Sequence, residues 1–314
     1  MSKISVIVPV YNEEKNINEF IKRTELSLNK TKLDYEIIFL LDPSTDNSKE
    51  IILNEIEKNK KIKLILFSRR FGQPAATMAG ISHVTGSRCV IIDCDLQDPP
   101  ELIYDLSKKM DEGYDVVLAR RKSRQGETLI KRFITNVGYV FIEKITDIKI
   151  PKNTGDFRII SKRVIDNLKQ FKEPNAFLRG LVAYIGFKQT YIEYNRERRF
   201  SGETKYNKYF GSLKIAFNGI FGFSSRPLFI MSIIGFIFAF ISFFIGLYYI
   251  IVKFIDPSLT PGLSSTILFI TFFSGLNLIG LGLLGEYVGR IYDEVKNRPN
   301  FIIDKKYNFD EWNW

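Results

Sequence analysis

Apolar and polar positions alternate in two regular ways along the first part of the chain. Short apolar runs rich in β-branched residues predict five strands, at residues 4–10, 35–41, 63–67, 90–92 and 115–119. Helical spacing between them predicts helices at residues 13–28, 74–84 and 102–110, and one that starts at Thr45 or Asp46 and reaches Ile56. Because short connections join alternating strands and helices, we expect an α/β fold with a mostly parallel, doubly wound sheet.

Two long stretches of the second half contain no charged residue, at residues 228–252 and 259–285. As helices rising 1.5 Å per residue they would reach about 37 to 40 Å, which exceeds the roughly 30 Å core of a bilayer. Ordinary core helices are shorter and less apolar, so both stretches are expected to cross a membrane. Lys and Arg crowd the outer flanks of the pair, whereas Lys253 and Asp256 alone are charged between them. The positive-inside rule therefore predicts that both termini are cytoplasmic.

A third pattern precedes the first apolar stretch. Apolar residues recur at helical spacing there, at Phe210, Leu213, Phe217, Ile220 and Phe221. They predict an amphipathic helix in the membrane interface, with packing against the soluble domain as the alternative. The start of the chain lacks the apolar core of a signal peptide. The expected segments are a cytoplasmic α/β domain (1–206), the juxtamembrane helix (207–226), a first membrane helix (227–252), a short outer loop (253–263), a second membrane helix (264–289) and a cytoplasmic tail (290–314).

Composition narrows the classes of partner and chemistry. The net charge of +10 at pH 7 would suit nucleic acid or anionic lipid, but the aromatic residues gather in and beside the membrane stretches. We therefore expect lipid and no nucleic acid. Cys89 and Cys94 are too few for a disulfide framework, which fits a reducing compartment. His83 is the single histidine of the sequence, so a histidine-based triad is not expected.

Carboxylates follow the fourth predicted strand at once. Asp93 and Asp95 are spaced i, i+2, and Gln97 adds an amide oxygen before Pro99 and Pro100. In an open parallel sheet the crevice at the carboxyl ends of the strands collects ligands. Such oxygen ligands suit Mg²⁺ or Mn²⁺, which is commonly shared with substrate phosphates. A solvated turn after a buried strand is the alternative interpretation.

Seven motifs in chain order resemble those of one enzyme family. They are Pro9-x-Tyr-Asn-Glu13, Asp42-x-Ser-Thr-Asp46, Ser68-Arg-x-Phe-Gly72, Asp93-x-Asp-x-Gln-Asp-Pro99, Gly155-Asp-Phe-Arg158, Arg199-Phe-Ser-Gly-Glu-Thr-Lys-Tyr206 and Gly285-Glu-Tyr-Val-Gly-Arg-Ile-Tyr292. With the two apolar stretches, they make the chain resemble the family 2 glycosyltransferases of GT-A fold. Within that family it is similar to the polyisoprenyl-phosphate glycosyltransferases, the group of bactoprenol glucosyltransferase and dolichol-phosphate mannose synthase. The resemblance covers nearly the whole chain.

The resemblance implies a site for a nucleotide sugar at the strand ends. Asp93, Asp95 and Gln97 would hold Mg²⁺ or Mn²⁺ together with the donor diphosphate. The remaining nucleotide-sugar contacts would come from Pro9, Tyr11, Glu13 and Asp42, with Ser68, Arg69 and Gln73 as further candidates. The sequence departs from the family's usual Asp-Asp-Gly-Ser at one point, where it has Leu-Asp-Pro-Ser at residues 41–44.

The acceptor in this group is a lipid phosphate, so the resemblance also implies cations close to the membrane. The expected lipid-phosphate contacts are Arg120, Arg132, Arg199 and Lys205. Asp156 matches the proposed catalytic aspartate, with a structural salt bridge to Arg158 as the alternative. A phosphate acceptor is mostly deprotonated near pH 7, so Asp156 would position the acceptor or stabilise charge on the sugar rather than remove a proton.

The resemblance implies an inverting transfer of one sugar from a nucleotide donor, glucose from UDP-glucose as the first expectation, to undecaprenyl phosphate. The product would serve cell-envelope glycan modification, such as that of the O-antigen of lipopolysaccharide. The enzyme is expected as a multi-pass protein of the bacterial inner membrane and as a homo-oligomer, a tetramer by resemblance. One alternative, a processive polysaccharide synthase, would need a Gln-x-x-Arg-Trp motif, yet the only tryptophans are Trp312 and Trp314. The other is a non-catalytic, nucleotide-binding membrane scaffold.

Overall fold

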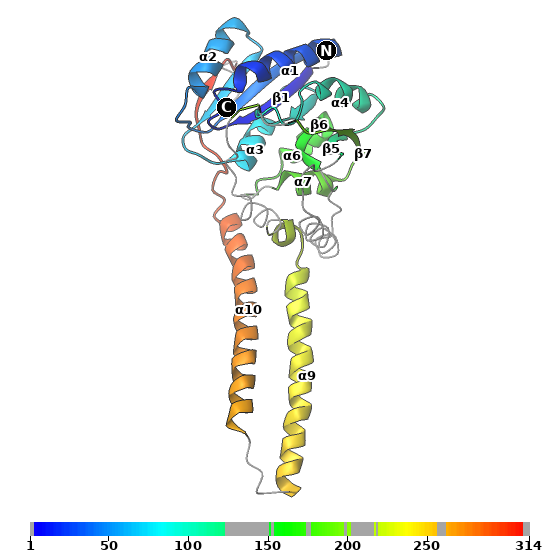
Figure 1. The fold of residues 1–314 in the computed structure, drawn as a ribbon, viewed down its shortest axis with the longest axis vertical. Coiled ribbons are helices and arrows are strands. Elements are labelled where there is room, and N and C mark those ends of the chain that lie inside the picture. The colour runs from blue at the N-terminus through cyan, green and yellow to red at the C-terminus, as the bar shows by residue number, and fades with distance from the viewer. Residues whose placement is uncertain are drawn as a thin grey trace.

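A computed structural model of the chain describes residues 3–122, 151, 154–173, 177–197, 200–201, 217, 219–255 and 262–309. An eight-stranded sheet with the order β7-β5-β6-β4-β1-β2-β3-β8 forms its centre, and two long helices project from one side (Figure 1). The strands are β1 (Lys3–Val10), β2 (Asp34–Leu41), β3 (Ile62–Phe67), β4 (Arg88–Ile91), β5 (Val116–Arg121), β6 (Thr154–Ser161), β7 (Gln189–Tyr194) and β8 (Ile303–Tyr307). The helices are α1 (Ile17–Thr31), α2 (Ser48–Lys58), α3 (Gln73–His83), α4 (Leu102–Met110), α6 (Lys162–Leu168), α7 (Leu178–Ile185), α9 (Arg226–Ile255) and α10 (Leu263–Val295).

The four central strands are parallel and come from the apolar runs of the sequence. β1 pairs with β2 along its whole length, with Val10 opposite Leu41, and with β4 on its other side. β3 continues the parallel order beyond β2. Runs that are apolar throughout suit parallel strands, because helices cover both faces of such a sheet. The α/β prediction is confirmed, and the four strands end at one side of the sheet, called here the carboxyl edge.

Antiparallel strands complete the sheet at both ends. β6 lies antiparallel between β4 and β5, and β8 is antiparallel to β3. β7 pairs in parallel with β5 and is the outermost strand at the end of the sheet away from β8. The sheet is therefore mixed, and the sequence analysis predicted none of β6, β7 and β8. The segment expected as a tail contributes β8, so it belongs to the same sheet as the N-terminal strands.

Two predicted helix starts are wrong, because the loops after β1 and β2 bind each other. α1 begins at Ile17 rather than at residue 13, since Asn12 takes a left-handed φ of 53° and its backbone N–H binds Ser44 Oγ at 3.0 Å. The N-cap of α2 is Asn47 rather than residue 45 or 46. The Asp46 carboxylate lies beside that cap and accepts the backbone N–H groups of Glu14, in the loop after β1, and of Ser48, the first residue of α2.

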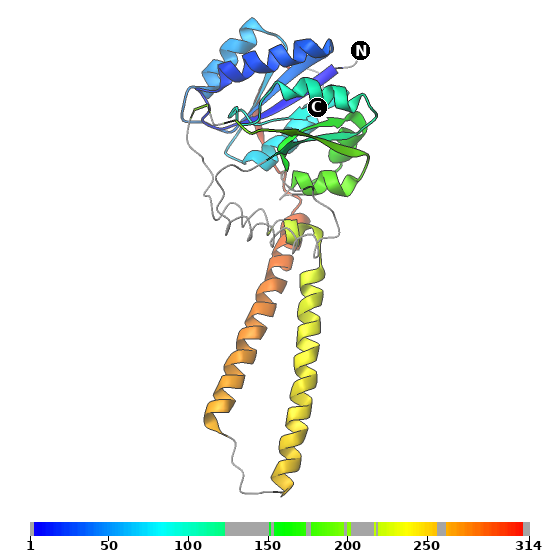
Figure 2. The same ribbon diagram turned by 45° about the vertical axis from the view of Figure 1, so that its right-hand side comes forward.

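Two layers of helices enclose the sheet. α1, α2 and α4 cover one face, where Phe20 and Phe39 meet edge to face with their ring centroids 6.3 Å apart. α3, α6 and α7 cover the other, and a Cβ at Gly80 of α3 would lie 2.6 Å from Leu40 Cδ1. The second layer lies on the side from which α9 and α10 project (Figures 1 and 2). The side chains of β6 alternate between the two layers, with Ile159 in the first and Ile160 in the second.

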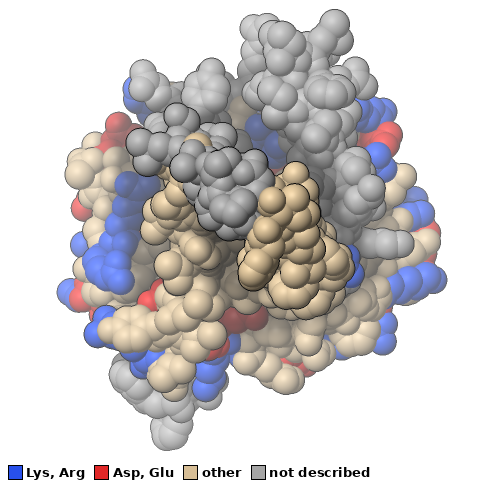
Figure 3. Space-filling model, turned by 90° about the horizontal axis from the view of Figure 1, so that it is seen from below, with Lys and Arg blue, Asp and Glu red and all other residues tan. Residues whose placement is uncertain are grey.

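The helices α9 and α10 are long and apolar enough to cross a membrane. The best segments, Arg226–Val252 and Phe269–Val295, have mean hydropathies of 2.7 and 1.5. They lie side by side as a hairpin, with Phe238 packed against Phe272 and Phe273 (Figure 2). α9 and α10 extend beyond the expected 227–252 and 264–289, since helical structure continues into the charged flanks. Lys and Arg side chains lie at several places around this side of the sheet domain, with Asp and Glu among them (Figure 3).

The amphipathic helix expected at residues 207–226 lies largely outside the described residues. Its last turns are helical at residues 219–223 and pack on the base of the hairpin. Phe221 meets Tyr287 edge to face at 5.3 Å between centroids, and Tyr287 Oη donates to the backbone carbonyl of Ser224 at 2.6 Å. Whether the helix lies in the membrane interface stays a prediction.

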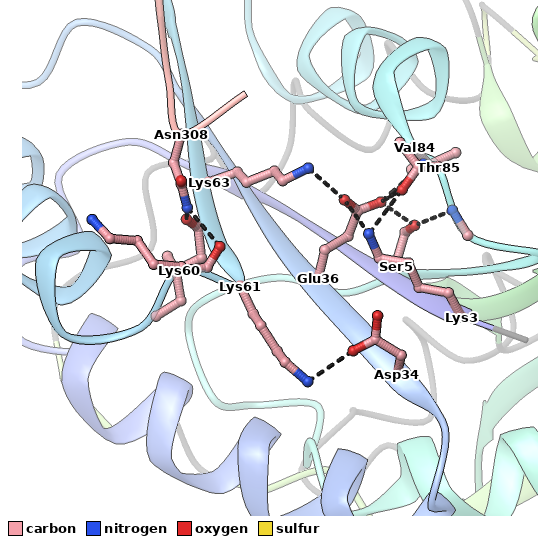
Figure 4. A network of polar contacts seen from close by, with 12 residues as sticks. Lys3, Ser5, Asp34, Glu36, Lys60, Lys61, Lys63, Val84, Thr85 and Asn308 are labelled. Atoms are coloured by element: carbon pink, nitrogen blue, oxygen red, sulfur yellow. Dashed lines mark hydrogen bonds and ion pairs between the residues drawn. The ribbon is translucent and has the colours of Figure 1, made fainter. Parts of the chain in front are cut away.

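A buried acid stabilises the sheet at the edge opposite the carboxyl edge (Figure 4). Glu36 of β2 is 1% exposed and accepts hydrogen bonds from Ser5 Oγ at 2.6 Å and from the backbone and hydroxyl of Thr85, both at 2.9 Å. The ammonium groups of Lys3 and Lys63 lie 3.1 and 2.9 Å from its carboxylate. Burial opposes ionisation, but these donors and cations lower the pKa of Glu36 to about 2. Glu36 is therefore a structural carboxylate.

Candidate active site

Aspartates gather where β4 reaches the carboxyl edge. The Asp93 carboxylate accepts a hydrogen bond from Gln73 Nε2, at the start of α3, at 2.6 Å. Leu96 takes a left-handed φ of 59°, and this turn lets the Gln97 N–H donate to Asp95 Oδ1 at 3.1 Å. Burial, and then the charges of Asp156, Asp95 and Asp98, raise the pKa of Asp93 to about 8. The structure thus places Asp156 of β6 within electrostatic reach of the Asp93 motif.

The donor set of this cluster fits a hard divalent cation in part. Asp93 and Asp95 supply carboxylate oxygens, and mutual repulsion of the four aspartates is the kind of charge imbalance that such a cation relieves. Within the described ranges, no three His, Cys, Asp or Glu side chains form a ready ligand set. Mg²⁺ and Mn²⁺ commonly complete their coordination with substrate phosphates and water, so two carboxylates with Gln97 fit a cation that binds together with its substrate.

Asp156 is held by two arginines. Arg179 of α7 binds it in a bidentate manner, with Nε 2.9 Å from Oδ1 and Nη2 3.3 Å from Oδ2. Arg158 Nη2 lies 3.8 Å from the same Oδ1. Burial alone would favour the protonated acid, but the charge and hydrogen bonds of Arg179, with Arg158 behind it, lower the pKa of Asp156 below its ordinary value. The salt bridge to Arg158 is present as the sequence suggested, but Arg179 is the closer partner and was missed.

Arg158 is a buried cation under the site. It is 1% exposed and donates to the backbone carbonyls of Gly155 at 2.8 Å and of Asp156 at 3.1 Å. Burial lowers the pKa of its guanidinium to about 10, while Asp156 opposes that change, so the group remains charged at neutral pH. Arg158 therefore fixes the backbone of β6 on which Asp156 stands.

A second buried aspartate, Asp98, forms a cluster that the sequence analysis also missed. It is 2% exposed and accepts a short hydrogen bond from the Tyr194 hydroxyl, and Arg121 Nη2 and Arg196 Nε both lie 3.5 Å from Oδ1. Burial and the Asp98 charge raise the pKa of Tyr194. A Cβ at Gly155 would lie 2.9 Å from Arg121 Nη2, so this glycine leaves the space that the arginine occupies. The cluster ties β5, β6 and β7 to the turn after β4.

Asp42 fixes the loop that follows β3. Its Oδ1 and Oδ2 accept the backbone N–H groups of Phe71 and Gly72 at 3.0 and 2.9 Å, and the residue is 4% exposed. The Arg70 guanidinium carbon lies 3.9 Å from the centroid of the Tyr11 ring. The structure therefore joins two predicted nucleotide contacts, Asp42 and Tyr11, through one loop.

The other two predicted nucleotide contacts lie on and just after β1. Pro9 is half-buried in the strand, opposite Leu40 of β2. The Glu13 backbone N–H donates to Ser48 Oγ at 3.0 Å, and its carboxylate accepts a short hydrogen bond from Asn16 Nδ2. Both residues stand at the carboxyl edge, where the sequence analysis expected them.

Of the four predicted lipid-phosphate contacts, the structure describes Arg120. Its guanidinium lies over the ring of Tyr191, 4.6 Å from the centroid, and Nε is 3.9 Å from the Glu193 carboxylate. Both partners belong to β7. The side chain is 34% exposed, which leaves it accessible to an anion. Arg132, Arg199 and Lys205 fall outside the described residues, and their roles stay predictions.

Several known proteins are similar to this chain. The sequence model of Glycosyl transferase family 2 matches residues 5–169. An uncharacterized glycosyltransferase of Bacillus subtilis (strain 168), YkcC, is 44% identical over 98% of this chain and 94% of the relative. A prophage-derived bactoprenol glucosyl transferase of Shigella flexneri is 38% identical over 97% of this chain and 98% of the relative. A solved structure of glucosyl-3-phosphoglycerate synthase from Mycobacterium tuberculosis, with Mn²⁺, UDP and product, has a TM-score of 0.46 and 17% identity, over 70% of this chain and 78% of that one.

The extent of the sequence matches decides the family. The family match spans half of the chain, and the relatives match it from end to end, through both long helices and β8. The chain therefore belongs to glycosyltransferase family 2, with the GT-A fold, and within it to the polyisoprenyl-phosphate glycosyltransferase group.

Proposed function

We propose that this protein transfers one sugar from a UDP-sugar, with UDP-glucose as the first expectation, to undecaprenyl phosphate in the bacterial inner membrane. The observation that carries the proposal is the near full-length identity of 38% to proteins named bactoprenol glucosyl transferase. The position of the site supports it, since Arg179 of α7 binds Asp156 of β6, and α7 lies on the side of the sheet domain from which α9 and α10 project (Figure 1). A lipid phosphate held at the membrane surface approaches from that side.

The donor binds at the carboxyl edge in this proposal. Pro9 lies near the end of β1, and Tyr11 and Glu13 follow that strand. Asp42 follows β2, and Asp93 and Asp95 follow β4, so a nucleotide lying across the edge meets all three strand ends. Asp93, Asp95 and Gln97 would hold Mg²⁺ or Mn²⁺. When bound, that ion supplies positive charge against the leaving diphosphate. Gln73 orients Asp93 for this role through the hydrogen bond at 2.6 Å.

Asp156 acts as a fixed carboxylate rather than as a base. Its lowered pKa keeps it ionised at neutral pH, and the bidentate contact with Arg179 fixes its direction. The acceptor phosphate, with a second pKa of about 6, is already mostly ionised and gives up no proton to attack. A phosphate oxygen forms the new bond to the anomeric carbon as the bond from that carbon to the UDP oxygen breaks. This single displacement inverts the anomeric centre, and Asp156 stabilises positive charge on the sugar ring.

The acceptor side of the proposal rests on basic residues of the sequence, of which the structure describes Arg120. Arg120, Arg132, Arg199 and Lys205 would bind the lipid phosphate, and the amphipathic segment before α9 would bring the polyisoprenyl chain to the site. The proposal places the sheet domain in the cytoplasm, with α9 and α10 crossing the membrane. Association into a homo-oligomer is part of it and is measured by the mass of the purified complex.

The test is transfer of radiolabelled sugar from a panel of UDP- and GDP-sugars into undecaprenyl phosphate by the purified full chain, with Mg²⁺, Mn²⁺ or EDTA. We expect metal-dependent labelling of lipid from one UDP-sugar, lost in Asp95→Ala. Asp105→Ala is the matched control, because Asp105 is an exposed aspartate of α4 that is not among the proposed site residues. Folded wild-type protein that binds nucleotide yet labels no lipid with any donor would contradict the proposal.

A further inference from the structure

The chain that follows the second long helix returns to the carboxyl edge. α10 ends at Val295, and the chain then turns at Asn297, which takes a left-handed φ of 46°. β8 runs antiparallel to β3, with Ile303 opposite Phe67 and Tyr307 opposite Leu64. Because Phe67 is the last residue of β3, β8 enters the sheet at the carboxyl edge, beside the nucleotide-binding loops.

The entry of β8 contacts the loop between β3 and α3, called here the Ser68–Gly72 loop. The Ser68 N–H donates to the backbone carbonyl of Ile302 at 3.0 Å. The Phe301 ring meets Phe67 edge to face at 6.1 Å between centroids, and Phe67 meets Phe71 in the same way at 6.0 Å. One backbone hydrogen bond and a row of three rings therefore hold this loop against the returning chain.

The same loop carries contacts to the proposed donor site. Its Phe71 and Gly72 N–H groups bind the Asp42 carboxylate, and its Arg70 lies over the Tyr11 ring. The next residue, Gln73, binds Asp93. A shift of the loop would thus alter three strand ends of the donor site at once.

The far end of β8 is attached independently. Asn308 Nδ2 donates to the backbone carbonyls of Lys60 and Ile62, both at 2.7 Å. The Phe309 ring meets His83 edge to face at 6.1 Å and lies 5.0 Å from Lys63 Nζ. These contacts lie at the amino end of β3, away from the donor loop, so a change at Phe301 leaves β8 anchored.

We propose that Phe301 and Ile302 are positioning residues for nucleotide binding, through the Ser68–Gly72 loop. Binding of a nucleoside diphosphate by the N-terminal domain then depends on the chain beyond the second long helix. The inference rests on the proposed function for the identity of the ligand. The chain itself supplies a matched comparison, since Phe301 and Phe309 are half-buried aromatic residues at the two ends of the same strand.

The experiment compares Phe301→Ala, Phe301→Leu and Phe309→Ala with wild type, all as full-length protein in detergent. Hydrogen exchange of the peptide that covers residues 68–73 is measured without ligand, and UDP affinity by titration calorimetry. We expect Phe301→Ala to accelerate exchange there and to weaken UDP binding at least about fivefold. Phe301→Leu, which keeps an apolar side chain, restores most of both. Phe309→Ala lowers the thermal midpoint but leaves both within about twofold.

Four outcomes distinguish this inference from the proposed function. Unchanged exchange at residues 68–73 in Phe301→Ala would overturn the inference, as would equal effects of Phe301→Ala and Phe309→Ala on UDP affinity. Wild-type protein that binds no UDP would contradict the donor part of the proposed function, while the exchange comparison still decides whether Phe301 positions the loop. A matching loss of exchange protection and of UDP affinity, rescued by Phe301→Leu, supports the inference.

Discussion

Glu36→Gln tests the physical account of the sheet most sharply, because the buried acid has a defined energetic role. Its pKa falls from an ordinary 4.5 to about 2. At about 1.36 kcal/mol for each unit by which the pKa is lowered, that difference corresponds to about 3 kcal/mol of folding stability. Because the side chain is 1% exposed, solvent screens this contribution little. Glutamine keeps the size of the side chain but removes the charge that faces Lys3 and Lys63.

The sign of the pH dependence follows from the lowered pKa. The stabilisation by Glu36 is complete above about pH 4.5 and is lost as the pH falls from there toward 2. At pH 7 the loss of about 3 kcal/mol in Glu36→Gln predicts a fall of the thermal midpoint of about 6 to 12 °C for a domain of this size. Wild type should lose the Glu36 contribution as the pH falls from 4.5 to 2. The variant has no carboxylate at this position, so its stability should not show that loss.

The assay is thermal unfolding of purified protein, followed by intrinsic fluorescence, at pH 7 and at a series of acid pH values. Asp34→Asn is the matched control, since Asp34 begins the same strand but its ion pair with Lys61 is half exposed, at 51% and 47%. Exposed pairs contribute about 0 to 1 kcal/mol, so its midpoint should move by little. A Glu36→Gln midpoint within about 2 °C of wild type at pH 7, or equal falls in both variants, would refute the reasoning.

Three further predictions concern the site. Arg179→Ala should lower kcat/KM for sugar transfer about 100-fold, because it releases Asp156, while UDP affinity stays nearly unchanged. Arg179→Lys should restore part of the activity. An equal loss of UDP affinity would contradict a role specific to Asp156. Gly155→Ala should lower the thermal midpoint and kcat together, because the added Cβ would lie 2.9 Å from Arg121 Nη2. A variant with the midpoint and rate of wild type would show that the space at Gly155 is not needed. EDTA should abolish lipid labelling and excess Mn²⁺ restore it, and full activity in EDTA would remove the metal from the mechanism.

The central strands could be predicted from the sequence because their runs are apolar throughout. A strand buried on both faces leaves that signal whatever its neighbours are. β8 leaves none, since an exposed edge strand tolerates charged residues such as Asp304, Lys305 and Lys306, and such charges protect an edge from further pairing. β6 carries Arg158 and Asp156 at positions where a buried strand is normally apolar.

Some residues of the candidate site could likewise be located from the sequence, and others could not. Asp93, Asp95 and Asp42 could be located because each directly follows a recognisable strand, and parallel strands end at one edge. Arg179 could not, because it lies in α7, far along the chain from the strand ends, and meets Asp156 of β6 only in the folded structure. The cluster of Asp98 with Arg121 and Tyr194 has the same origin, since its members come from separate strands and a turn.

The measurement that tests the central claim most directly is the structure of the lipid product. Purified protein is incubated with undecaprenyl phosphate, Mg²⁺ and the UDP-sugar that labels it, and the lipid is examined by mass spectrometry and by NMR of the anomeric proton. The account predicts one sugar per lipid, linked through the phosphate, with the anomeric configuration opposite to that of the donor. A lipid bearing a chain of sugars, or one sugar with the donor's configuration retained, would contradict it.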